Sequence, residues 1–196
     1  MGRPREFDTE TALTDAMNVF WEHGYDAASL SVLLDGMGLT RGSLYKAFTD
    51  KKTLFLRVLM QYEIETVNPA ISLLTSGPTD GLARIKSLFG SIADVVRNGD
   101  ERGCLLCSAA AGPAAVDDDI SEMVHAQLGR MKDAFGTALA QSAAYAQSSD
   151  HDRRSMTSLL LTQYIGLRVL VRSQASIETI QDSADAITGL LHETAE

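Results

Sequence analysis

Residues 29–48, SLSVLLDGMGLTRGSLYKAF, decide how the amino-terminal part of this chain folds. Ser29 is a favourable helix N-cap, and Leu30, Leu33 and Leu34 then share one helical face. The glycine-bearing stretch 36–38 interrupts this helix, and Thr40 can cap a second one. Two helices joined by a short turn that contains glycine form a helix-turn-helix, and the second helix of such a motif normally enters the DNA major groove.

The second helix, over residues 41–48, has an inner and an outer face. Leu44, Ala47 and Phe48 fall on the inner face, whereas the outer face is polar. Arg41 is the best candidate for a base contact, because a guanidinium matches the O6 and N7 acceptors of guanine. The other candidates for DNA contact in and near this helix are Ser31, Thr40, Gly42, Ser43, Tyr45 and Lys46.

Beyond the motif itself, the pattern of residues resembles the DNA-binding domain of the TetR family of bacterial transcriptional regulators. The matching residues are Gly24-Tyr25, Gly38, Thr40-x-Gly42-Ser43-Leu44-Tyr45-x-x-Phe48, Lys51 and Leu54-Phe55. The resemblance covers about the first third of the chain. It implies a three-helix DNA-binding domain over residues 1–48 and an effector-binding and dimerisation domain over residues 49–196, joined by the helix that starts at residue 50.

The resemblance also implies roles for individual residues. Tyr45 looks like the family's phosphate-contacting tyrosine, and Lys51 resembles its phosphate-binding lysine. Arg3 and Arg5 lie in a short arm that can reach phosphates or the minor groove, although a frayed, solvated terminus is an equal alternative. For Lys46 the alternative is a solvated surface side chain.

Composition is ordinary for a folded chain, with 45% hydrophobic residues and 22% charged residues in 196. The net charge of −9 argues at first against nucleic acid, but its distribution is uneven. Residues 1–60 carry eight acidic and seven basic side chains, so the excess of acid lies in the rest of the chain. No signal peptide is recognised, and the most apolar stretch is too short to span a bilayer, so we expect a cytoplasmic protein with no membrane partner.

The remainder of the chain predicts an all-α protein of about nine helices, because apolar residues recur at helical spacing and no segment alternates with period two. The penultimate helix, over residues 150–172, is apolar around much of its circumference, and the last helix repeats apolar residues every three or four positions. We expect these two helices to pair with their copies in a homodimer. Burial within one chain is the alternative.

Cys104-Leu105-Leu106-Cys107 is the second informative stretch. Spacing of three places both sulfurs on one helical face, and Gly103 makes Cys104 a residue of the first helical turn, where a thiolate is favoured. A disulfide within a regular helix is awkward, since the two Cβ atoms lie about 5–6 Å apart and a disulfide requires about 3.5–4.5 Å. Packing or pocket lining is the alternative to redox sensing. A metal site with His125 has too few ligands, and no cofactor is expected.

These patterns predict a ligand-responsive, homodimeric DNA-binding regulator, most simply a repressor released from a palindromic double-stranded operator. The effector would be a small molecule or an electrophile that modifies cysteine. By helix position in the family, its pocket would involve Tyr62, Phe89, Cys104, Cys107, Met123 and Tyr164. A ligand-independent DNA-binding or protein-interaction module is the alternative. An enzyme is not indicated, because no catalytic motif is present.

Overall fold

The structure is a computed structural model that describes residues 8–193, with side chains described to Leu191. It is all-α throughout this range, as the sequence predicts. The helices are α1 Thr9–Ala27, α2 Leu30–Gly36, α3 Arg41–Phe48, α4 Lys51–Tyr62, α5 Asn68–Ser76, α6 Gly81–Arg97, α7 Leu105–Ala111, α8 Asp118–Ala140, α9 Asp150–Arg172 and α10 Ile177–Glu193. Because α4 runs into α5 without a break, the described chain has nine separate helical rods, which agrees with the predicted number. Arg3 and Arg5 lie outside the described residues.

Side-chain caps set the start of each helix in the amino-terminal bundle α1–α3. Asp8 accepts a hydrogen bond from the Glu10 amide, and Ser29 accepts one from the Val32 amide. Gly24 and Gly38 have φ angles of 78° and 59°, which turn the chain after the straight part of α1 and between α2 and α3. The inner faces of the three helices meet in a core whose fully buried side chains include Phe20, Leu33, Leu44 and Phe48.

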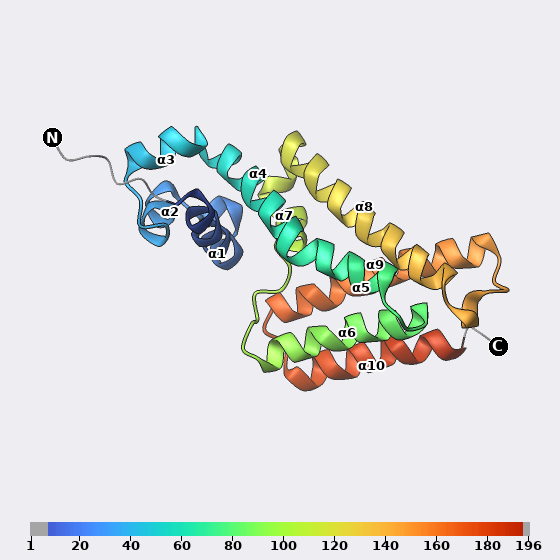
Figure 1. The fold of residues 1–196 in the computed structure, drawn as a ribbon. Helices are drawn as coiled ribbons and strands as arrows, with labels where there is room; N and C mark the ends of the chain where they lie inside the picture. The colour runs from blue at the N-terminus through green and yellow to red at the C-terminus, as the bar shows by residue number, and fades with distance from the viewer. Residues whose placement is uncertain (1–7, 194–196) are drawn as a thin grey trace.

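The connecting helix α4 is capped by Asp50, whose carboxylate accepts a hydrogen bond of 2.7 Å from the Thr53 amide. Pro69 would end or kink a regular helix here, because proline lacks an amide hydrogen and crowds the preceding turn. The structure accommodates it by widening the preceding turn into a π-helical segment, Glu63–Val67, after which α5 continues. Figure 1 shows α4 leaving the amino-terminal bundle and continuing into α5 within the larger bundle.

The larger bundle is built from α5, α6, α8, α9 and α10. The helices α6 and α10 run side by side, and α8 packs against both α5 and α9 (Figure 1). The short helix α7 lies between α1 and α8, so it touches both parts of the molecule. Among the described residues, none of the helices combines the length and hydrophobicity that a membrane span requires.

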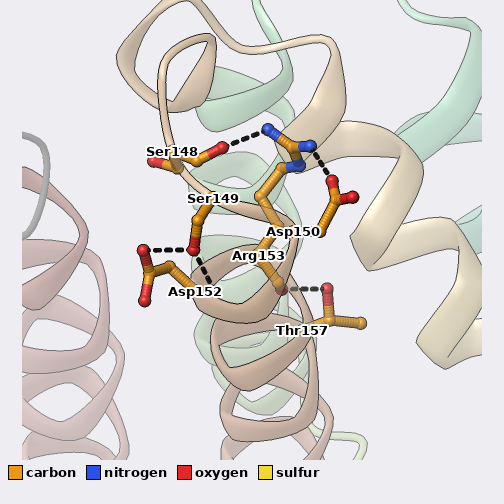
Figure 2. A network of polar contacts seen from close by, with 6 residues as sticks. All are labelled: Ser148, Ser149, Asp150, Asp152, Arg153 and Thr157. Atoms are coloured by element: carbon orange, nitrogen blue, oxygen red, sulfur yellow. Dashed lines mark hydrogen bonds and ion pairs between the residues drawn. The ribbon is translucent and has the colours of Figure 1, made fainter.

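A polar network fixes the start of α9 (Figure 2). The Ser149 hydroxyl accepts a hydrogen bond of 3.1 Å from the Asp152 amide, which caps the helix. The Arg153 guanidinium donates to the Ser148 carbonyl oxygen and forms an ion pair with Asp150. The loop before α9 is thereby tied to its first turn, which sets where the long apolar helix begins.

Candidate nucleic-acid interface and buried cysteine site

The outer face of α3 presents three polar side chains to solvent, namely Arg41, Tyr45 and Lys46. Tyr45 is 43% exposed, and its ring lies 5.7 Å from the guanidinium carbon of Arg41. The opposite face is anchored by the fully buried side chains of Leu44 and Phe48. The helix therefore holds its polar face outward on a rigid base.

The amino-terminal end of α3 is capped by Thr40. Its hydroxyl accepts a hydrogen bond of 3.2 Å from the Ser43 amide and lies 3.0 Å from the Ser43 hydroxyl. A Cβ atom placed on Gly42 would meet nothing within 4 Å, so the fold itself does not require a glycine there. Ser31 is exposed on α2, with its hydroxyl 2.9 Å from that of Ser29.

Two neighbouring lysines at the start of α4 have different surroundings. The Lys51 ammonium lies 4.6 Å from the centroid of the Tyr25 ring and donates to the Asp26 carbonyl oxygen at 3.3 Å. Partial burial lowers the pKa of Lys51. Lys52 instead forms ion pairs with Asp117 at 2.9 Å and Asp119 at 2.5 Å, which raise its pKa. Lys51 therefore belongs to the surface of α1–α3, whereas Lys52 ties α4 to the start of α8.

Cys104 is the N-cap of α7 rather than a residue of its first turn, which corrects the expectation from the sequence. Its φ and ψ angles are −120° and 126°, and the helix begins at Leu105. Cys104 and Cys107 are both free and buried. The distance argument against a disulfide assumed that both cysteines are helical. It does not apply here, because Cys104 has extended backbone and only Cys107 lies in the helix.

Three contacts favour the ionised form of Cys104. The Cys107 thiol donates to its sulfur, the positive charge of Arg168 lies nearby, and the Tyr62 hydroxyl donates to it at 3.5 Å. Together they lower the pKa of Cys104 to about 5, against the opposing effect of burial. The pKa of Cys107 is raised by its contact with Cys104 and by burial, so Cys104 is the sulfur that ionises first.

Arg168 on α9 is a residue that the sequence interpretation did not select. It is only 8% exposed, and no carboxylate of the described residues lies within ion-pair distance of it. Its guanidinium lies 6.0 Å from the centroid of the Tyr164 ring. The available signal was a single basic residue inside a long apolar stretch, because such a residue is seldom buried without a partner.

The six residues named for an effector pocket divide into two groups. Tyr62, Cys104, Cys107 and Tyr164 all lie around Arg168 in one buried cluster. Phe89 is farther along the core, where it stacks on Phe135, which in turn contacts Tyr164. Met123 is half-buried on α8 at the edge of the core.

The buried cysteine cluster is connected to α1 by direct contacts. The Tyr62 ring meets Trp21 edge to face, with centroids 5.0 Å apart. Arg102, in the loop before α7, covers the Trp21 ring at 4.1 Å and donates to the Asn18 side chain at 2.8 Å. A short path of packed side chains therefore runs from Cys104 through Tyr62 and Trp21 into the amino-terminal bundle.

Within the described residues, no three His, Cys, Asp or Glu side chains come together in a way that could hold a metal ion. His125 is exposed on α8 and lies 3.3 Å from the Ser121 hydroxyl.

An exposed polar recognition helix on a three-helix bundle defines the class, namely a helix-turn-helix DNA-binding regulator. Residues 12–58 match the family model described as bacterial regulatory proteins, tetR family. This match places a TetR-type DNA-binding domain over residues 12–58 and supports a DNA-binding transcriptional regulator. This confirms the resemblance drawn from the helix-turn-helix residues.

Three relatives extend the likeness over almost the whole chain. An uncharacterised HTH-type transcriptional regulator of Bacillus subtilis, YezE, is 27% identical over 97% of this chain and 100% of its own. The HTH-type transcriptional repressor ComR of Escherichia coli is 27% identical over 93% of this chain and 88% of its own. A cysteine mutant of the TetR family transcriptional regulator CifR, solved with double-strand operator DNA, has a TM-score of 0.82 and 27% identity, over 95% of this chain and 98% of that one.

Proposed function

We propose that this protein is a homodimeric repressor that binds an operator through α3 and is released when its buried core is altered by a small molecule or by modification of Cys104. The observation that carries the proposal is the path of contacts from Cys104 through Tyr62 to Trp21, because it joins a reactive site in the core to the DNA-binding bundle. Repression is supported by ComR, which is named a repressor, and operator binding by CifR, which was solved on operator DNA.

On the DNA, α3 would lie in the major groove with Arg41 toward a guanine edge. Thr40, Gly42, Ser43, Tyr45 and Lys51 would approach the backbone, with Ser31 and Lys46 beside them. The exposed position of Tyr45 and Lys46 supports this assignment. The open space at Gly42 supports close approach of DNA, since nothing inside the chain occupies it. Residues 1–48 would form the DNA-binding domain and residues 49–196 the regulatory domain.

The dimer would form through α9 and α10. On α9, Leu159 and Val169 are exposed although they are large and apolar, and the small residue Gly166 lies on the same face. On α10, Ala186 and Gly189 are likewise exposed. A surface of apolar and small residues on two adjacent helices fits a self-complementary contact with two-fold symmetry.

Release of the operator would follow from a shift between two conformations in which the regulatory core and the amino-terminal bundle are arranged differently. Half-sites on DNA lie about one helical turn or a multiple apart, so the two α3 helices of a dimer must keep that separation. A change at Cys104 or in the core beside it would displace Tyr62 and then Trp21. Since Trp21 belongs to α1, the bundle that carries α3 would move with it.

Selection of DNA from a random pool tests the proposal. The expected product is an inverted repeat, because two α3 helices related by two-fold symmetry read equivalent half-sites. The Arg41→Ala variant is expected to relax the preference at one base pair of each half-site, at a cost of about 1–3 kcal/mol in binding. Recovery of no enriched sequence by the wild type would refute the function, and an unchanged motif for the variant would refute the role of Arg41.

Substitution of the neighbouring residues Lys51 and Lys52 distinguishes a loss of DNA contact from an effect on folding. We expect Lys51→Ala to weaken binding to all DNA sequences and to reduce the slope of log K against log salt by about one unit. Lys52→Ala is the matched control, because Lys52 is held by Asp117 and Asp119. Titration of operator DNA at several salt concentrations measures both slopes. An equal change for the two variants would contradict a specific phosphate contact by Lys51.

A further inference from the structure

A cavity of about 370 Å³ lies where the amino-terminal bundle meets the larger bundle. Its walls come from α1, the π turn with α5, α6, the loop before α7, and α9. Most of the lining is apolar and includes Leu73, Leu88, Ile92 and Val95. Tyr164 is the one residue of the expected effector pocket that also lines this cavity.

Two unsatisfied hydrogen-bond donors belong to residues that line the cavity. The indole Nε1 of Trp21 and the guanidinium Nε of Arg168 are both buried and have no partner among the described residues. Trp21 is 7% exposed and Arg168 is 8% exposed. A buried donor without a partner costs about 1–3 kcal/mol, so an acceptor that reached either nitrogen would be stabilised.

The charge around the cavity favours an anion as this acceptor. Asp100 also lines the cavity, but both of its oxygens are taken by Arg102, at 2.9 and 2.8 Å. Arg168 has no carboxylate partner within ion-pair distance among the residues described, and its charge acts on both Asp100 and the Cys104 thiolate. The cavity is thus apolar over most of its surface and positively charged at Arg168.

We propose that this cavity binds a small monocarboxylate with an apolar body, whose oxygens accept hydrogen bonds from Arg168 and Trp21. A carboxylate has two acceptor oxygens, and its hydrogen bonds to a guanidinium are stronger than those between neutral groups. The apolar body would lie against the aliphatic side chains of α5 and α6. This inference names an effector class and so rests on the proposed regulatory function, although binding itself can be measured without DNA.

The position of the two donors gives the ligand a direct effect on the DNA-binding bundle. Trp21 stands on α1, whereas Arg168 stands on α9. A carboxylate held by both would join the two parts through the same indole ring that Tyr62 and Arg102 contact. It would also draw Arg168 away from Cys104, so the ligand carboxylate and the Cys104 thiolate would compete for the positive charge of Arg168.

Trp21 is the only tryptophan in the chain, so its fluorescence reports on the cavity directly. We expect sodium octanoate to change this fluorescence in a saturable way, whereas octan-1-ol, which has the same chain length and no charge, changes it far less. The Arg168→Met variant keeps the length of the side chain and removes its charge, and we expect it to bind octanoate at least about tenfold more weakly. Arg168→Lys should bind octanoate with intermediate affinity, because lysine keeps the positive charge but cannot donate the two parallel hydrogen bonds of a guanidinium.

Circular dichroism and thermal unfolding first establish that each variant is folded. Cys104→Ser is the control for the thiol, and octanoate should bind it at least as tightly as it binds the wild type, because Arg168 then faces no thiolate. Equal responses to octanoate and octan-1-ol, or an unchanged affinity in both Arg168 variants, would overturn the proposal. Operator binding without octanoate is measured separately, so a failure of DNA binding would refute the regulatory function and leave the fluorescence result standing.

Discussion

Alkylation of native Cys104 by iodoacetamide is expected to reach half its maximal rate well below the unperturbed pKa of about 8.5 at which an ordinary cysteine does so. Only the thiolate attacks the reagent, forming a carbon–sulfur bond as iodide leaves. The Cys107 thiol, Arg168 and Tyr62 all stabilise that thiolate. The rate is measured by mass spectrometry from pH 4 to 9 on Cys107→Ser and Cys104→Ser, each of which retains one of the two cysteines.

The two variants are expected to behave differently. Cys107→Ser keeps Cys104, with a serine hydroxyl in place of the thiol donor, so its midpoint should stay well below that of an ordinary cysteine. Cys104→Ser keeps only Cys107, whose thiol is buried, so reaction should begin only at alkaline pH. Identical pH profiles would show that Cys104 is not specially ionised. Under the proposed function, alkylation releases the operator from Cys107→Ser and leaves Cys104→Ser bound.

The same ionisation makes stability depend on pH. The pKa of Cys104 is lower in the folded protein than in the unfolded chain, so the folded state is favoured when the thiol is ionised. This contribution is fully present above the unfolded pKa of about 8.5 and is lost as pH falls through the folded pKa of about 5. Cys104→Ser should show less loss of stability over this interval than the wild type.

The amino-terminal bundle could be predicted from sequence because its signals are local. Ser29 and Thr40 cap their helices through amides three residues away, and Gly38 takes the left-handed conformation that the turn between α2 and α3 requires. Leu44 and Phe48 fell on the inner face because helical spacing determines which side chains point together. Each of these features needs only a few neighbouring residues, so the pattern and the structure agree.

The cysteine site and the cavity depend on contacts between residues far apart in the chain. Arg168 comes near Cys104 because α9 packs against α7, and it lines the same cavity as Trp21. No spacing in the sequence encodes that arrangement. Trp21 is buried, as the size of its apolar side chain favours, but its unpaired indole nitrogen depends on what surrounds it. Extended backbone at Cys104 likewise follows from the turn at Gly103 rather than from the helical pattern after it.

Replacement of Gly103 by alanine is expected to destabilise the protein by about 2–5 kcal/mol. Gly103 has a φ of 72°, a conformation that costs other residues roughly 1–2 kcal/mol. A Cβ atom there would also lie 2.6 Å from the Arg168 carbonyl oxygen and 2.9 Å from the Arg172 Cβ, and crowding of this kind adds about 1–3 kcal/mol. Chemical denaturation of the wild type and the variant measures the difference.

Gly99→Ala is the matched control for this prediction. Gly99 has a φ of 88°, yet a Cβ atom added to it would meet nothing within 4 Å. It should therefore show only the backbone cost of about 1–2 kcal/mol. Equal losses in the two variants would mean that the loop before α7 can move away from α9 at little cost. The larger loss expected for Gly103→Ala would instead show that this loop is held against α9, which is the condition for Arg102, Cys104 and Arg168 to act on Trp21 together.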